Sequence, residues 1–280
     1  MSLRHTSWLL PALVSCWPLA VSAQLQLVPD AQPPRVFAGE ARTVTVVWHN
    51  AGDKAAAADI SARMLQTSSA TAVQLYERPW KRLQVLPGQT VVESVLINFP
   101  AVRTETRFFV QWLADTNRII GRTEIFVYPT NLLAGLKPLA ADDSLGVFDP
   151  LNQLKPLLKN LKLKITDLEN IDLENFSGRL AIIGPFQSKT QMRAGLAKQV
   201  QALVKKGAAI VWLQPPTEKC AIPVPSFYSV PAGQVAVVMV QPDMVADLAD
   251  NPQSQLNLVY FCRLAFNPQP FVLPDPSPQP

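Results

Sequence analysis

The chain has 280 residues, of which 48% are hydrophobic and 16% are charged, and its formal net charge is +4. This length allows two ordinary domains, and this composition is typical of folded rather than disordered protein. A net charge so close to zero, with no cluster of Lys and Arg among aromatic residues, argues against nucleic acid as a partner.

The first 23 residues have the pattern of a secretory leader. Arg4 precedes the uncharged run SWLLPALVSCWPLAVSA, which is too short to span a bilayer comfortably and ends in VSA, with small residues where a signal peptidase acts. We therefore expect cleavage before Gln24, export to the periplasm or the exterior, and no membrane span afterwards. A second interpretation stays open, because LVSC, ending at Cys16, resembles the lipobox of bacterial lipoproteins.

Residues 24–129 contain short β runs separated by turn residues. RTVTVVWHN alternates apolar and polar residues, and QTVVESVLINF, TRFFVQWL and RTEIFVY follow at similar spacing. This pattern predicts an antiparallel β-sandwich, which we expect to be immunoglobulin-like. Because this segment has no cysteine pair, its core must rest on large aromatic side chains. These are Trp48, Trp80, Phe99, Phe109 and Trp112.

Residues 130–144 form a connector that is not a flexible Gly/Ser linker. Its apolar residues are Leu132, Leu133, Leu136, Pro138 and Leu139. Leaving each large apolar side chain in water would forfeit about 1.5 kcal/mol or more, so we expect the connector to pack against one or both domains.

Residues 145–267 alternate apolar strand segments with helical patterns. The strands are LGVFD, LKITDL, RLAIIGPF, AAIVWLQ and QVAVVMVQ. One helix is expected after Asp149-Pro150, where Pro156 either kinks it or marks its true start. A second runs from about Ser188 to Lys206, and a third opens at Asn251-Pro252. The alternation predicts a mostly parallel sheet covered on both faces, and residues 268–280 a Pro-rich tail.

Four stretches in this order, LGVFDP, GRLAIIGPF, LAKQVQALVKKGAAIVWLQPP and QVAVVMVQPD, resemble a flavodoxin-like domain. The domain is related to class I glutamine amidotransferases, in the degenerate form attached to bacterial glycosidases and envelope proteins. The resemblance covers about residues 142–267, and the preceding sandwich is similar to the accessory sandwiches of such proteins.

The resemblance implies that an active member would carry a nucleophilic cysteine on a tight turn after a strand, with a histidine downstream. Here the strand at residues 208–214 runs into Pro215-Pro216, which cannot form a glycine-flanked elbow. The two histidines are His5, in the leader, and His49, in the sandwich. We therefore expect the amidotransferase site to be lost.

Two cysteines remain after the leader is removed, and three interpretations of them stay open. Cys220 could be a reactive thiol, although only Lys219 lies near it in sequence. Cys220 and Cys262 could form a disulfide in an oxidising compartment. Alternatively, Cys262 is a small buried hydrophobe and Cys220 an inert loop thiol.

Other motifs give little support for catalysis. Acidic pairs are expected to be solvated or to cap helices. They occur at Asp142-Asp143, Asp167/Glu169, Asp172/Glu174 and Asp247/Asp250. The sequence has no His/Cys cluster for zinc, no spaced aspartate loop for calcium and no glycine-rich phosphate loop, so we expect no metal and no cofactor.

These observations favour an exported, non-catalytic scaffold or binding protein, whose partners would be envelope proteins or a carbohydrate-active enzyme. The alternative is a hydrolase or amidotransferase-like enzyme that uses Cys220 or an unrecognised carboxylate. Any ligand of the parallel sheet is expected beyond the carboxyl ends of its strands. The residues that leave those ends are Asp149, Gln187, Ser188, Gln214 and Gln241.

Overall fold

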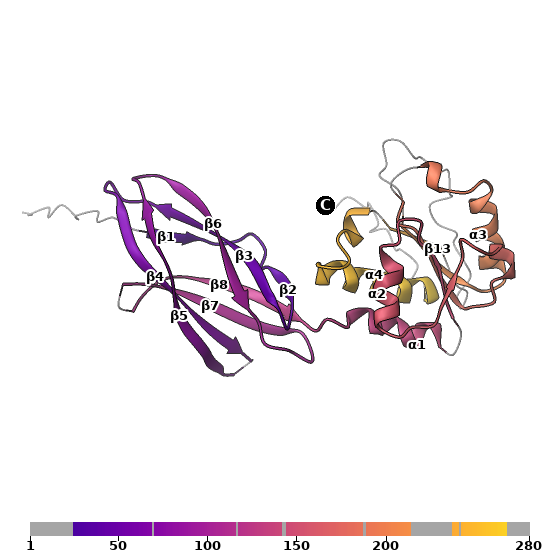
Figure 1. Ribbon diagram of the computed structural model, residues 1–280, viewed down its shortest axis with the longest axis horizontal. Coiled ribbons are helices and arrows are strands. Elements are labelled where there is room, and N and C mark those ends of the chain that lie inside the picture. The colour runs from indigo at the N-terminus through magenta and orange to yellow at the C-terminus, as the bar shows by residue number, and fades with distance from the viewer. Residues whose placement is uncertain are drawn as a thin grey trace, which may run out of the picture.

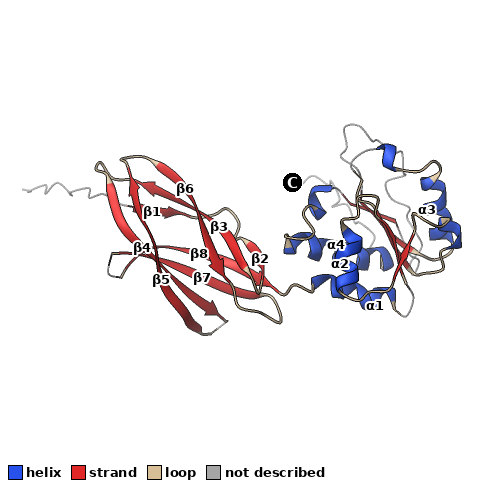
Figure 2. Ribbon diagram, in the orientation of Figure 1, coloured by secondary structure: helices blue, strands red, loops and turns tan. Residues whose placement is uncertain are grey.

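The computed structural model describes residues 25–68, 70–115, 117–141, 144–186, 189–213, 237–240 and 242–267. In this part of the chain there are two bodies, one made of strands alone and one that combines strands with helices (Figure 1 and Figure 2). The predicted leader with Cys16, the Pro-rich tail, and Cys220 lie outside the described residues.

The first body consists of two sheets that face each other. The smaller sheet has the order β1 (Leu25–Val28), β3 (Ala41–Asn50), β6 (Thr90–Asn98). The larger has the order β2 (Arg35–Phe37), β8 (Arg118–Tyr128), β7 (Thr106–Ala114), β4 (Ala56–Thr67), β5 (Ala72–Val85). Neighbouring strands are antiparallel except β2, which runs parallel to the last residues of β8.

The core of this body lies between the sheets, because alternate residues of each strand point inward. Trp48 of β3 and Trp112 of β7 are fully buried there, with ring centroids 5.7 Å apart in an edge-to-face arrangement. Trp80 packs against Trp112 at 5.2 Å from a partly buried position, and Phe99 is buried as expected.

The prediction that Phe109 belongs to the core is wrong. Phe108, Val110 and Trp112 point inward from β7, and Phe109 is one residue out of phase with them. Its ring therefore lies on the outer face of the larger sheet, where the Arg122 guanidinium sits 4.4 Å from its centroid.

The connector packs on the second body. It forms the 3₁₀ helix η1 (Leu132–Leu136) and the short helix α1 (Lys137–Ala140). Leu133, Leu136 and Ala140 are buried in one cluster with side chains of the parallel sheet and of helix α4 (Pro252–Phe266). The prediction that this apolar segment is packed is confirmed, and it is part of the second core.

The second body is built around a five-stranded sheet in which every strand pair is parallel. Its order is β10 (Ile165–Asp167), β9 (Leu145–Phe148), β11 (Leu180–Ile183), β12 (Ala209–Leu213), β13 (Val237–Val240). The remaining helices are α2 (Leu154–Asn160), α3 (Leu196–Lys205), η2 (Leu173–Asn175), η3 (Lys189–Gln191) and η4 (Pro242–Val245).

Both faces of this sheet are covered, as predicted. On β11, Leu180 and Ile182 join the cluster formed with α2 and α4, whereas Ala181 and Ile183 join the cluster formed with α3. All four side chains are fully buried. This explains why the strands are continuous apolar runs rather than alternating ones.

Two helix starts differ from the sequence prediction. The first helix begins at Leu154 instead of Pro150, so Pro156 lies in its first turn, where no N–H is needed, and of the two possibilities left open it marks the start of the helix rather than a kink. The second begins at Leu196 instead of about Ser188, because Gly195 has φ 76°, a left-handed conformation that a continuous helix cannot include. The third begins at Pro252 as predicted, with the Asn251 side chain accepting a hydrogen bond from the Gln253 N–H.

The two bodies touch through a few polar contacts. Arg35 of β2 donates a hydrogen bond to the side chain of Gln253 in α4. Arg42 of β3 pairs with Asp250 at 3.2 Å, and Asp250 is largely exposed. Exposed ion pairs add little stability, so the covalent connection and the packed connector dominate this junction. Among the described helices, none is long and apolar enough to span a bilayer.

Candidate functional site

The site predicted from sequence lies at the carboxyl edge of the parallel sheet, and one of its five residues can be placed. Asp149 follows β9 directly. Gln187 and Ser188, after β11, lie outside the described residues, as do Gln214, after β12, and Gln241, after β13. The structure therefore gives the surroundings of Asp149 and leaves the other four as predictions.

Asp149 is buried, with 1% of its surface exposed, and its carboxylate is engaged by the chain itself. It accepts hydrogen bonds from the N–H groups of Gln153 (3.1 Å), Leu154 (2.8 Å) and Lys155 (2.9 Å). These N–H groups belong to the N-cap residue and the first turn of α2, where no intrahelical acceptor exists. Asp149 thus acts as a cap from four to six residues away, and its negative charge lies at the favourable end of the helix dipole.

A buried lysine bridges two carboxylates beside this cap. The Lys155 Nζ lies 2.6 Å from Glu169 Oε1 and 3.0 Å from Asp167 Oδ2. The same Glu169 oxygen accepts a hydrogen bond from the Asp149 N–H at 2.9 Å. Through these contacts the ends of β9 and β10 and the start of α2 are tied together.

The charges in this group stabilise one another. Burial alone lowers the pKa of the Lys155 ammonium, but Glu169 and Asp167 outweigh burial, so the pKa lies above its ordinary value. Burial alone raises the pKa of Asp167, yet the hydrogen bond from Lys155 helps to hold that pKa below its ordinary value. Neither group is set up as a proton donor or acceptor near neutral pH.

The expectation that Asp167 and Glu169 are merely solvated acids is wrong in part. Their side chains are 39% and 30% exposed, but each is paired with Lys155, whose side chain is 10% exposed. One signal was present in the sequence. Lys155 stands in the first turn of a helix, where a cation is unfavourable unless a nearby acid compensates for it.

The opposite face of the sheet carries aromatic side chains at the same edge. Phe148, Ile183 and Trp212 are in register across β9, β11 and β12. The Arg193 guanidinium lies over the Phe148 ring, 5.6 Å from its centroid. Arg193 Nη2 and Trp212 Nε1 are buried and have no acceptor in the described part of the chain, so a water or a bound acceptor would stabilise this edge.

The described cysteine is unsuited to nucleophilic chemistry. Cys262, on α4, forms no disulfide within the described part of the chain and is fully buried in the core, and this burial raises its pKa well above the ordinary range. Since Cys220 lies outside the described residues, their pairing stays a prediction. His49 lies far from these groups in sequence and fold, on β3, with Nδ1 3.0 Å from Thr90 Oγ1.

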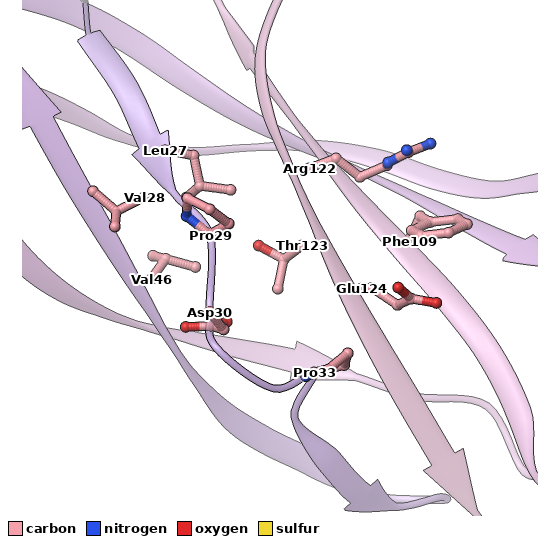
Figure 3. A pocket seen from close by; sticks show the side chains of 10 residues that line it. All are labelled: Leu27, Val28, Pro29, Asp30, Pro33, Val46, Phe109, Arg122, Thr123 and Glu124. Carbon is pink, nitrogen blue, oxygen red and sulfur yellow. The ribbon is translucent and has the colours of Figure 1, made fainter. Parts of the chain in front are cut away.

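A second concave site, which the sequence did not suggest, lies in the sandwich. It is a cavity of about 220 Å³ between the chain that leaves β1 and the edge of β8 (Figure 3). Its lining residues are Leu27, Val28, Pro29, Asp30, Pro33, Val46, Phe109, Arg122, Thr123 and Glu124. They come from four strands and one loop, so no local sequence motif predicts this cavity. Among the described residues no group of three or more His, Cys, Asp or Glu is placed to bind a metal ion.

No family model and no curated protein matches the chain. A β-glucosidase from Listeria innocua in complex with glucose is similar at 14% identity and a TM-score of 0.28, over 38% of this chain and 16% of that one. The alkylpurine DNA glycosylase AlkC from Pseudomonas fluorescens is similar at 12% identity and a TM-score of 0.29, over 38% and 31%. The chain thus spans less than a third of either protein.

Proposed function

We propose that this chain is an exported, non-catalytic scaffold or binding protein of the bacterial envelope. Residues 1–23 would direct export, and Cys16 would anchor the chain to lipid if the lipobox is used instead. The sandwich and the parallel-sheet domain would together present surfaces to envelope proteins or to a carbohydrate-active enzyme.

The strand orders support more specific fold assignments within this proposal. In chain order the parallel sheet has its strands arranged second, first, third, fourth, fifth, which is the flavodoxin-like order. In the sandwich, the first, third and sixth strands form one sheet, and the seventh and eighth strands lie beside the fourth in the other, as expected for an immunoglobulin-like fold. We therefore propose an immunoglobulin-like domain followed by a degenerate amidotransferase-like domain.

One observation carries the proposal. A parallel sheet holds its reactive groups at its carboxyl edge, and here the charged side chains at that edge are already paired. Lys155 forms ion pairs with Asp167 and Glu169, and Asp149 accepts hydrogen bonds from the first N–H groups of α2. A general base would need a free lone pair and a pKa near neutrality, and a nucleophile would need such a base beside it. Residues 145–267 contain no histidine to supply one.

The experiment uses the purified chain and its Cys220→Ser variant. Glutamine hydrolysis is first measured as ammonia release, and we expect none above a heat-denatured control. The tagged chains are then cross-linked in envelope fractions, and we expect both to capture the same stoichiometric partner. Ammonia release that disappears in Cys220→Ser would instead establish the enzyme alternative.

A further inference from the structure

The sandwich cavity exists because the chain changes sheets there. Leu27 of β1 packs tightly on β8, since a Cβ added to Gly121 would lie 2.3 Å from the Leu27 Cβ. Further along, β2 pairs with β8, beginning with the hydrogen bond from the Phe126 N–H to the Pro34 carbonyl at 2.9 Å. Between these two points the chain bows away from β8 and leaves an open stretch of strand edge.

That open edge presents main-chain groups to the cavity. Along a strand, every second residue directs its N–H and C=O to the same side. Because the Phe126 N–H points toward β2, the N–H and C=O groups of Glu124 and Arg122 point to that side as well. Within the described residues no backbone hydrogen bond joins them to residues 28–33.

Most of the polar side chains around the cavity are already engaged. Thr123 accepts a hydrogen bond from Trp112 Nε1 at 2.9 Å. Glu124 pairs with Arg107 at 3.4 Å. The Arg122 guanidinium is held over the Phe109 ring and is turned away from Asp30, as Figure 3 shows.

Asp30 is the exception. Asp30 is exposed at the rim of the cavity, next to Val28 and Pro29, and partial desolvation of its carboxyl raises its pKa. No hydrogen bond or ion pair to Asp30 occurs in the described part of the chain. A cation that brings its own donors can therefore pair with this carboxylate without displacing a partner from the chain.

The size and the walls of the cavity narrow the class of ligand. A volume of about 220 Å³ is below the roughly 300–1,000 Å³ of pockets that hold drug-sized molecules. The apolar walls from Leu27, Val28, Pro29, Pro33 and Val46 suit an aliphatic stem, in the way that lysine and arginine stems cover apolar surface. An ammonium or guanidinium at its end would donate to Asp30 and to the open carbonyl groups of β8.

We propose that this cavity binds an aliphatic monocation, an ammonium or guanidinium group on a short alkyl stem, with Asp30 as its counter-ion. The ligand is either a basic side chain of a partner protein or a free alkylamine. This site is independent of the function proposed above, because it lies in the sandwich and uses none of the residues at the parallel-sheet edge.

The test is a titration of the ¹⁵N-labelled full chain, followed by amide chemical shifts. n-Butylammonium and n-butylguanidinium should give saturable shifts at Asp30 and Glu124, and n-butanol, which has the same stem without the charge, should not. Asp30→Asn should weaken binding about tenfold, equivalent to the loss of one charge-assisted contact. Asp59→Asn, which removes an exposed carboxylate on β4, should leave it unchanged.

A second variant and a second ligand keep the test decisive. Val28 is 40% exposed, so Val28→Trp should fill the entrance without disturbing the core, and it should abolish the shifts. Tighter binding of Nα-acetyl-lysine methylamide than of n-butylammonium identifies a protein side chain as the source, and the reverse identifies a free amine. Equal shifts with n-butanol, or unchanged affinity in Asp30→Asn, would overturn the proposal.

Discussion

Replacing Asp149 by alanine should destabilise the parallel-sheet domain. The change leaves three N–H groups of α2 without their acceptor, at a position that is 1% exposed and where water cannot substitute. An exposed cap is worth about 1 kcal/mol, and a single hydrogen bond to a charged group about 1.5–3 kcal/mol. Because the three bonds share one carboxylate and are not additive, we expect a loss of about 3 kcal/mol. Asp149→Asn keeps one acceptor oxygen and should lose about half of that.

Hydrogen exchange read by mass spectrometry measures this loss locally. Peptides covering β9 and β11 should exchange faster by a factor equivalent to that free energy, while peptides of the sandwich should not change. Asp172→Ala is the matched control, since Asp172 precedes η2 but makes no capping hydrogen bond with its side chain. A loss below about 0.5 kcal/mol in Asp149→Ala, no more than at an ordinary surface site, would refute the structural role of this carboxylate.

Three further predictions concern the charged group, the sandwich core and the buried thiol. Lys155→Met should cost about 2 kcal/mol near neutral pH, less than a fully buried pair because its partners are about one-third exposed. Since the pKa of Asp167 is held below its ordinary value of 3.8, the stability that its ionised form contributes is present above pH 3.8 and is lost as the pH falls through the lower pKa of the folded state. The deficit of Lys155→Met in urea unfolding should therefore shrink on going to about pH 2, and an unchanged deficit would contradict the pairing. Thr123→Val should lower the unfolding free energy of the sandwich by about 1–2 kcal/mol in denaturant titrations, because it leaves the buried Trp112 N–H without an acceptor. A loss smaller than that of a Thr→Val change on the surface would argue against this hydrogen bond. With the other cysteines replaced by serine, Cys262 should react with a maleimide only as fast as the domain opens, and rapid labelling of the native chain would show that it is not buried.

The parts of the fold that local chemistry determines were predictable from the sequence. Asn251-Pro252 supplies a cap and a first residue that needs no N–H, and the last helix begins there. Gly207, with φ 95°, follows the end of α3 in the left-handed conformation that glycine commonly adopts after a helix. The continuous apolar strands correctly indicated a sheet covered on both faces, because each of their residues meets a core.

The errors arose where a tertiary contact decides between local alternatives. Phe108 and Phe109 are adjacent and identical in type, so the register of β7 alone decides which one is buried. The ion pairs of Lys155 with Asp167 and Glu169 depend on the pairing of β9 with β10, because these residues lie 12 or more positions apart in the sequence. The sandwich cavity likewise depends on where β1 crosses β8, and no local pattern in the sequence encodes that crossing.

The reactivity of Cys220 distinguishes a non-catalytic domain from an amidotransferase-like enzyme, because Cys220 is the nucleophile that such an enzyme would use. The rate of iodoacetamide alkylation is measured at neutral pH on the reduced, folded chain, with the modified residue identified by mass spectrometry and glutathione as the reference thiol. We expect Cys220 to react no faster than glutathione and its alkylation to leave partner capture intact. Alkylation at least tenfold faster than glutathione, accompanied by loss of a measurable hydrolytic activity, would contradict it.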